Sequence, residues 1–299
     1  MNEGVVCSIP KRFHVIMLLA LGMLVVHVMR TNLGMAEVAI VDSFHLKTPE
    51  EMQNTSFRPS GVDVLSGPNV GFLNSAMYIG LVLLHIPAGF LTLRFETRWC
   101  FLFGAFLSAT VNNFVPLMLE NVISVRYKDA VMFFWCTVFL RILQGMFEAV
   151  LMPACYQLMG KWIPQTETSR FGSLVFSGVY GGAILGFLLG GFVISWDWRA
   201  IFWLSSAMVY IWCILFTLVV HESPLHHPTI QESETKLIHD GYRLNTSGKV
   251  CNFIFSNHLD IYFLNFRIFV YHGVIFLLQC LFGHCVSAIL HEIGPTTFC

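Results

Sequence analysis

Long uninterrupted apolar stretches constrain this chain more than any other feature of its sequence. A helix that crosses the hydrocarbon core of a bilayer needs about 20 predominantly apolar residues. The charged residues gather between stretches of this kind, so the sequence predicts an all-α protein that spans a membrane several times. Six clear apolar blocks cover residues 13–41, 69–91, 99–119, 130–153, 171–195 and 200–220, and a less regular seventh covers 259–282.

The composition excludes a soluble protein. Hydrophobic residues make up 56% of the 299 residues and charged residues only 12%, with a mean hydropathy of +0.67. Soluble domains are typically about 45–50% apolar and about 25% charged. The net charge of −1 gives no reason to expect a nucleic-acid partner. The first apolar run follows Lys11 and Arg12 and is too long for a cleavable signal, so we expect it to stay as a span.

Metal or enzymatic chemistry finds little support in the sequence. The nine cysteines include no CxxC pair and lie mostly inside apolar blocks, where we expect them to act as small apolar side chains. His221, His226 and His227 form one histidine cluster, but a di-iron site would need several. There is no glycine-rich phosphate loop and no nucleophile motif. We therefore expect no cofactor, no bound metal and no catalytic residue.

The distribution of Lys and Arg orients the chain. With the amino terminus in the cytosol, the cytoplasmic segments carry nine Lys and Arg residues and the opposite side carries five. The glycosylation triplet at Asn54 then falls on the non-cytoplasmic side, and the one at Asn245 falls on the cytoplasmic side and would be unused. The predicted organisation is a cytoplasmic amino terminus (1–12), a six-span bundle (13–220), a cytoplasmic connector (221–258) and a seventh span with a divergent tail (259–299).

An arginine lies deep in the first apolar block. Ionisable side chains at membrane depth are costly and normally face a protein interior or a water-filled cavity. Glu37 follows Arg30 by seven residues, which places both on one face of a helix about 10 Å apart along its axis. His27 lies one turn before Arg30. Arg30 either lines a cavity as a binding site for an anion, or pairs with Glu37, or extends to the interface.

The fourth block repeats this arrangement with Arg141 and Glu148, again seven residues apart, and with Gln144 one turn from Arg141. Burial favours the neutral form of the Glu148 carboxyl, whereas Arg141 favours its charged form. Balanced in this way, Glu148 could gain and lose a proton near physiological pH. The alternative is a static buried ion pair that only fixes helix packing.

Glycines recur every four residues through the fifth block. This spacing keeps them on one stripe of a helix, where the backbones of two helices can approach closely. We therefore expect a helix-packing role for Gly178, Gly182, Gly186 and Gly190.

Several motifs carry a resemblance to a known family. The longest runs from Arg141 to Glu148 (RILQGMFE) and continues through Pro153-Ala-Cys-Tyr to Lys161-Trp-Ile-Pro164. Further matches are Glu222-Ser-Pro224 with His227-Pro-Thr-Ile230, Arg30-Thr-Asn-Leu-Gly-Met-Ala36, Ile86-Pro-Ala-Gly89 and the Ser169-Arg170 pair. Over about residues 11–245 the chain resembles the amino-terminal half of the anion/cation symporters of the major facilitator superfamily, which include vesicular glutamate transporters, sialin and type I sodium–phosphate cotransporters.

The resemblance implies two six-helix bundles with a substrate cavity between them. It implies secondary active transport of small organic anions or phosphate, driven by a proton or sodium gradient or by membrane potential, in a plasma, vesicle or lysosome membrane. Arg30 resembles the family's anion-binding arginine of the first span. Arg141 and Glu148 resemble the family's fourth-span pair, in which the acid acts in proton coupling or allosteric control, and we take Arg141 as a second candidate for holding the anion's charge. We add Asn74 and Tyr78 of the second span as candidate substrate-binding residues, and Glu37 as a second candidate for proton coupling.

Two departures from the family pattern accompany these expectations. Vesicular glutamate transporters carry a histidine where this chain has Asn74, and an asparagine side chain cannot titrate. From about Val250 onward the family motifs end, so Asn252 to Cys299 is a divergent seventh span, a translated intron or a frameshifted end. Because alternating access needs two cavity walls, the expected partners are a second copy or a full-length family member. The rival is a truncated isoform that regulates relatives without transporting.

Overall fold

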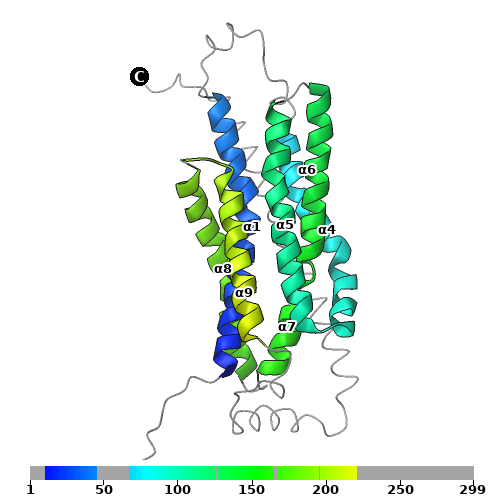
Figure 1. The fold of residues 1–299 in the computed structure, drawn as a ribbon, viewed down its shortest axis with the longest axis vertical. Helices are drawn as coiled ribbons and strands as arrows, with labels where there is room; N and C mark the ends of the chain where they lie inside the picture. The colour runs from blue at the N-terminus through cyan, green and yellow to red at the C-terminus, as the bar shows by residue number, and fades with distance from the viewer. Residues whose placement is uncertain (1–10, 46–66, 125–126, 164–166, 195, 221–299) are drawn as a thin grey trace, which may run out of the picture.

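The structure, a computed structural model, describes residues 11–45, 67–124, 127–163, 167–194 and 196–220 (Figure 1). The predicted seventh span, the connector, the three histidines from His221 to His227 and both glycosylation triplets lie outside these residues. Within them the chain forms seven helices and no strand: α1 (Lys11–His45), α4 (Gly67–Arg94), α5 (Thr97–Ser124), α6 (Tyr127–Glu148), α7 (Leu151–Trp162), α8 (Thr168–Val193) and α9 (Ala200–Val219).

The all-α membrane fold predicted from the apolar blocks is confirmed. In the described residues, six segments are long and apolar enough to cross a membrane, and each corresponds to one of the six clear blocks. The helices run along the long axis of the molecule (Figure 1). The helices α1, α4 and α5 extend beyond their predicted blocks at both ends, because their polar ends continue the helix beyond the hydrocarbon-length core.

The fourth span differs most from its prediction. The expected block ended at residue 153, but the span continues to Trp162 and is divided into α6 and α7 directly after Glu148. Proline has no backbone N–H, so Pro153 cannot donate the helical hydrogen bond to the carbonyl of Ala149. Backbone bonds on either side remain, from Ala149 N to Gly145 O at 3.0 Å and from Ala154 N to Val150 O at 3.2 Å.

The helices pack as two groups of three spans, and the two groups have the same pattern of helix contacts. In the first, α1 packs against α8 and α9; in the second, α6 packs against α4 and α5; and α5 meets α9 between them. The pattern of contacts stays the same when α1, α4 and α5, the first three spans in the sequence, are exchanged in order with α6, α8 and α9. Figure 1 shows the α1, α8 and α9 group beside the α4, α5 and α6 group, with α7 at one end. The arrangement therefore has an internal two-fold relation.

Glycines allow the closest helix contacts in both groups. A Cβ atom on Gly178 would meet the carbonyl oxygen of Ala20, and one on Gly182 would meet the carbonyl oxygen of Leu24. Gly186 and Gly190, the other two members of the stripe, likewise lie against α1. All four are buried, so the stripe lies where α8 meets the α1 backbone.

The equivalent contact in the second group lies where α4 crosses α6. A Cβ atom on Gly80 would meet the carbonyl oxygen of Ile142, and one on Gly145 would meet the carbonyl oxygen of Met77. Gly145 lies between Arg141 and Glu148 in the sequence. This crossing therefore fixes the part of α6 that carries both ionisable side chains.

We expect Gly182→Ala to lower the melting temperature of the purified protein, because the added methyl group meets backbone atoms that cannot rotate away. Alanine normally stabilises a helix interior by about 0.5–1 kcal/mol relative to glycine, so the expected sign is reversed. The adjacent Gly181→Ala is the matched control, since its added Cβ would make only an ordinary contact, 3.8 Å from Leu24 Cδ1. Equal melting temperatures for the two variants would contradict this packing.

Candidate functional site

A buried ion pair joins the two groups of helices. Nε of Arg30, on α1, donates to Oε2 of Glu148, at the end of α6, over 2.6 Å. The Glu148 side chain is fully buried, and the Arg30 side chain is 13% exposed. A carboxylate removed from water is stable in its charged form only when it is paired and hydrogen-bonded, so this pair is the condition for burying Glu148.

The second oxygen of Glu148 is also occupied. Oε1 accepts hydrogen bonds from Ser108 Oγ on α5 at 3.0 Å and from Gln144 Nε2 at 3.2 Å. Gln144 in turn accepts a hydrogen bond from Nη1 of Arg141 through its Oε1, at 3.1 Å. Arg141 is therefore connected to Glu148 through Gln144, and the four side chains with Arg30 form one network across α1, α5 and α6.

The described side chains of this network carry both signs of charge. They include two guanidinium groups, from Arg30 and Arg141, and one carboxylate, from Glu148. The Arg141 guanidinium also lies over the ring of Phe202 on α9, with its central carbon 5.8 Å from the ring centroid, which is a favourable position for a cation. Among the described members of the network, Arg30 alone is partly exposed, and its guanidinium can hold an anion.

The structure relates the two sequence motifs across helices. Arg30 pairs with the acid of the second motif, Glu148, rather than extending to the interface. Both motifs read Arg-x-x-x-Gly-Met-x-Glu, and the first and fourth spans of a chain without re-entrant turns run in opposite directions. Antiparallel helices carrying the same motif place the arginine of one beside the acid of the other. Glu37 lies in α1, but its side chain is outside the described residues.

The other candidate residues lie on neighbouring helix faces. Asn74 and Tyr78 are half-buried, one turn apart on α4. His27 is buried, and its Nδ1 lies 2.7 Å from the carbonyl oxygen of Met23, a contact that holds the ring against its own helix. The network member that sequence reasoning missed is Ser108. A buried serine in an apolar block carries no distinguishing signal, and only the packing of α5 against α6 shows its partner.

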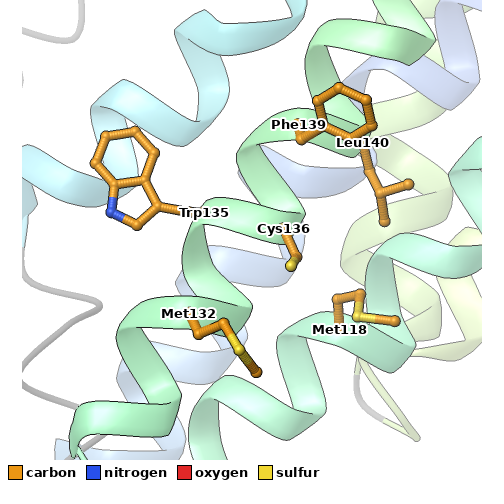
Figure 2. Close-up of a pocket in the computed structure, with 6 residues that line it drawn as sticks. All are labelled: Met118, Met132, Trp135, Cys136, Phe139 and Leu140. Carbon is orange, nitrogen blue, oxygen red and sulfur yellow. The ribbon is translucent and has the colours of Figure 1, made fainter.

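The described surface also carries an apolar groove that is separate from this network. Met118 of α5 and Met132, Trp135, Cys136, Phe139 and Leu140 of α6 line about 660 Å³ (Figure 2). Trp135 and Phe139 are 57% and 63% exposed, whereas Arg141 is buried. The groove walls are carbon and sulfur apart from one indole nitrogen, so they offer nothing to hold a charged substrate. We therefore place the candidate site at the buried network.

Metal ligation finds no structural basis in the described part of the chain. There, no three or more His, Cys, Asp and Glu side chains gather into a group that could hold a metal ion. Cys100, Cys136, Cys155 and Cys213 form no disulfide bond among the described residues.

Known proteins resemble this chain over most of its length. It matches the Major Facilitator Superfamily over residues 19–295. It is 30% identical over 248 residues to vesicular glutamate transporter 1 of Bos taurus, covering 82% of this chain and 41% of that protein. It is 30% identical over 234 residues to vesicular glutamate transporter 3 of Danio rerio, covering 77% and 37%. The match to vesicular glutamate transporter 2 of Homo sapiens is 28% over 238 residues, covering 78% and 38%. The chain thus spans about two fifths of the length of these curated relatives.

We expect Glu148→Gln to destabilise the folded protein by about 3 kcal/mol, because it leaves the Arg30 guanidinium without its carboxylate in a buried site. Unfolding of the purified protein in detergent, followed by intrinsic tryptophan fluorescence, would measure the change.

The control is Glu120→Gln, which removes the partner of an ion pair exposed to solvent. Arg199 and Glu120 approach within 2.8 Å, with side chains 37% and 45% exposed; hydrogen bonds to Glu120 and Asp197 raise the pKa of Arg199. Exposed pairs contribute about 0–1 kcal/mol. If both variants lost the same stability, Glu148 would not have the special role that its burial gives it.

Proposed function

Because this chain belongs to the major facilitator superfamily, we propose that it binds small organic anions and moves them across a membrane by secondary active transport. The observation that carries this proposal is the network of Arg30, Arg141 and Glu148 inside the bundle, in which the Arg30 guanidinium is partly exposed. An anionic carboxylate or phosphate would pair with that guanidinium. Charges in a membrane interior need such compensation, so the site favours anions over neutral or cationic solutes.

Arg30 is the residue that we propose to contact the anion first. Its Nε donates to Glu148, and its side chain keeps 13% of its surface exposed, so we propose that the rest of the guanidinium meets a carboxylate or phosphate. Arginine suits this task because its planar fork matches the oxygens of both groups. Arg141, which is buried and donates a hydrogen bond to Gln144, would add electrostatic attraction for the anion. Asn74 and Tyr78 on α4 would contribute polar contacts to the bound anion.

Glu148 is the residue that we propose to load and release a proton. An arriving anion competes with the Glu148 carboxylate for the same guanidinium, and protonation of Glu148 removes that competition. Anion binding and proton binding would then favour each other, which is the linkage that symport requires. The substrate preference and the driving ion, H⁺ or Na⁺, are parts of this proposal, as is residence in a plasma membrane or a vesicle membrane.

Alternating access needs a substrate cavity with two walls, one from each of two helix bundles. Transporters of this superfamily place their sites between two bundles that move against each other. We propose that a second copy of the chain or another family member supplies the second bundle. Substrate and proton would then shift the population of two pre-existing access states.

Uptake into liposomes that contain the purified chain, under imposed pH and voltage gradients, tests the proposal. Glutamate, sialic acid, urate and phosphate would be compared as labelled anions. We expect uptake of at least one of them, loss of uptake in Arg30→Ala, and loss of pH dependence in Glu148→Gln. We expect Arg141→Gln to raise the half-saturating anion concentration by at least about tenfold, the effect of one lost hydrogen bond to a charged group.

The matched control is Arg199→Gln, which removes an arginine outside the spans and should leave uptake unchanged. Folding of every variant would be checked by size-exclusion chromatography. Absence of uptake for all four anions with folded wild-type protein would overturn the proposal, as would full activity in Arg30→Ala.

A further inference from the structure

A small polar patch lies halfway along two neighbouring spans, on a side of the bundle that is not fully covered. Thr110 is at the middle of the α5 span, which runs from Thr97 to Ile123, and Tyr210 is at the middle of α9. Thr110, Asn113 and Tyr210 are each half-buried, so part of the patch reaches the surface. Lipid tails offer no hydrogen bonds at this depth, and polar side chains there normally face a protein partner.

The hydrogen bonds of the patch run in one direction and begin at the Asn113 amide. Thr110 Oγ1 donates to the carbonyl oxygen of Phe106 at 2.8 Å. Because the one hydroxyl proton of Thr110 is used in this way, Tyr210 is the donor in its 3.2 Å contact with Thr110 Oγ1. Asn113 Nδ2 donates in turn to Tyr210 Oη at 3.1 Å. Within the described part of the chain, the second amide N–H and Oδ1 of Asn113 have no partner.

The exposed side of α5 around Asn113 has the spacing of a helix–helix contact. We call this row of side chains the α5 stripe; it consists of Phe103, Phe106, Thr110, Asn113 and Leu117. Its members follow each other by three and four residues in turn, the spacing that turns one side of a helix toward a partner helix. Phe103, Phe106 and Leu117 are 54%, 44% and 44% exposed. Lipid tails can cover these three side chains, but they cannot bond to the amide between them.

We propose that two copies of the chain associate through the α5 stripe, with their Asn113 amides hydrogen-bonded to each other. Two copies inserted in the same orientation and related by a two-fold axis place identical residues opposite each other. Their α5 helices then run parallel, and the two amides meet at the same depth. An amide carries both a donor and an acceptor, so it is its own complement. This self-complementarity favours a second copy over an unlike partner, and one asparagine in a parallel helix pair also fixes the register.

The α5 stripe points away from the charged network. Ser108, which bonds to Glu148, is 0% exposed and lies on the inward side of α5. Thr110 follows two residues later, about 200° further around the helix. A copy bound at the stripe therefore leaves the network uncovered, and the second bundle of the proposed function would be a different neighbour. The association through the stripe does not rest on the proposed function.

Energy transfer between donor-labelled and acceptor-labelled copies of the full chain tests the contact in phosphatidylcholine liposomes, without substrate or gradient. Dilution with further lipid gives the dissociation constant of the pair as a protein-to-lipid ratio. We expect Asn113→Leu to raise this constant by about tenfold, the effect of one to two interhelical hydrogen bonds. Asn113→Gln keeps an amide, so its constant should lie closer to that of the wild type than to that of Asn113→Leu.

Ser177→Leu is the matched control for the loss of a polar group. Ser177 also lies near the middle of a span, α8, and is exposed, and its hydroxyl donates to the carbonyl oxygen of Leu174 at 2.7 Å. This variant should keep the dissociation constant of the wild type. Size-exclusion chromatography would show that each variant is folded.

Cross-linking provides a second measurement in case Asn113→Leu folds poorly. In a chain whose nine native cysteines are replaced by alanine, Asn113→Cys should form a covalent dimer on oxidation with copper phenanthroline. Ile184→Cys, at a position of α8 that is 63% exposed, should form none.

Energy transfer no higher than that of randomly distributed chains would show that lipid alone covers the α5 stripe, and would overturn the proposal. Equal dissociation constants for the wild type, Asn113→Leu and Ser177→Leu would place the contact on another surface, as would equal cross-linking from positions 113 and 184. None of these outcomes bears on anion uptake, so failure of this contact and failure of the proposed function are distinguishable.

Discussion

The charge of Glu148 is the constraint around which this bundle is arranged. A carboxylate at membrane depth is tolerable only with compensation from several directions. Glu148 accepts hydrogen bonds from Arg30 of one group of three spans and from Ser108 and Gln144 of the other. Arg141 donates to Gln144. Because these partners come from three helices, the helices must keep a fixed register for the charge to remain buried. The ion pair thus links local chemistry to the relation between the two groups.

Close backbone contacts make that register achievable. The hydrophobic effect does not hold helices together inside a bilayer, so packing and polar contacts must do so. The glycines of α8 bring its backbone against α1, and Gly80 with Gly145 bring α4 against α6. Each contact lies on a helix that carries part of the network or supports one. Bulky side chains at these glycines would push α8 away from α1 and α4 away from α6, and so would disturb the helices that carry Arg30 and Glu148.

Much of this architecture follows from the sequence on simple physical grounds. The six spans are visible as apolar blocks because the bilayer sets their length. Arg30, Arg141 and Glu148 stand out because charge is expensive there. The identity of their partners does not follow so directly, since spacing along one helix suggests Glu37 for Arg30 and Arg141 for Glu148. The repeated Arg-x-x-x-Gly-Met-x-Glu motif on antiparallel spans contains the information that pairs Arg30 with Glu148.

Other features needed the three-dimensional arrangement. Ser108, Asn112 and Ser206 are ordinary polar residues in apolar blocks, and only the packing of α5 against α6 and α9 shows their hydrogen-bond partners. The division of the fourth span was also not predicted, although the proline that causes it, Pro153, is present in the sequence. A proline in an apolar block does not by itself show whether the helix kinks, ends or continues.

That division has a mechanical consequence. The fourth span consists of two helices, α6 and α7, whose junction lies beside the buried carboxylate of Glu148. Bending a helix at a missing hydrogen bond costs less than bending an intact one, so deformation concentrates there. Thinning or curving of the surrounding bilayer tilts short rods more readily than it shortens a rigid span. Any bending of the fourth span is therefore concentrated where Glu148 meets Arg30, and it would move the carboxylate relative to the guanidinium.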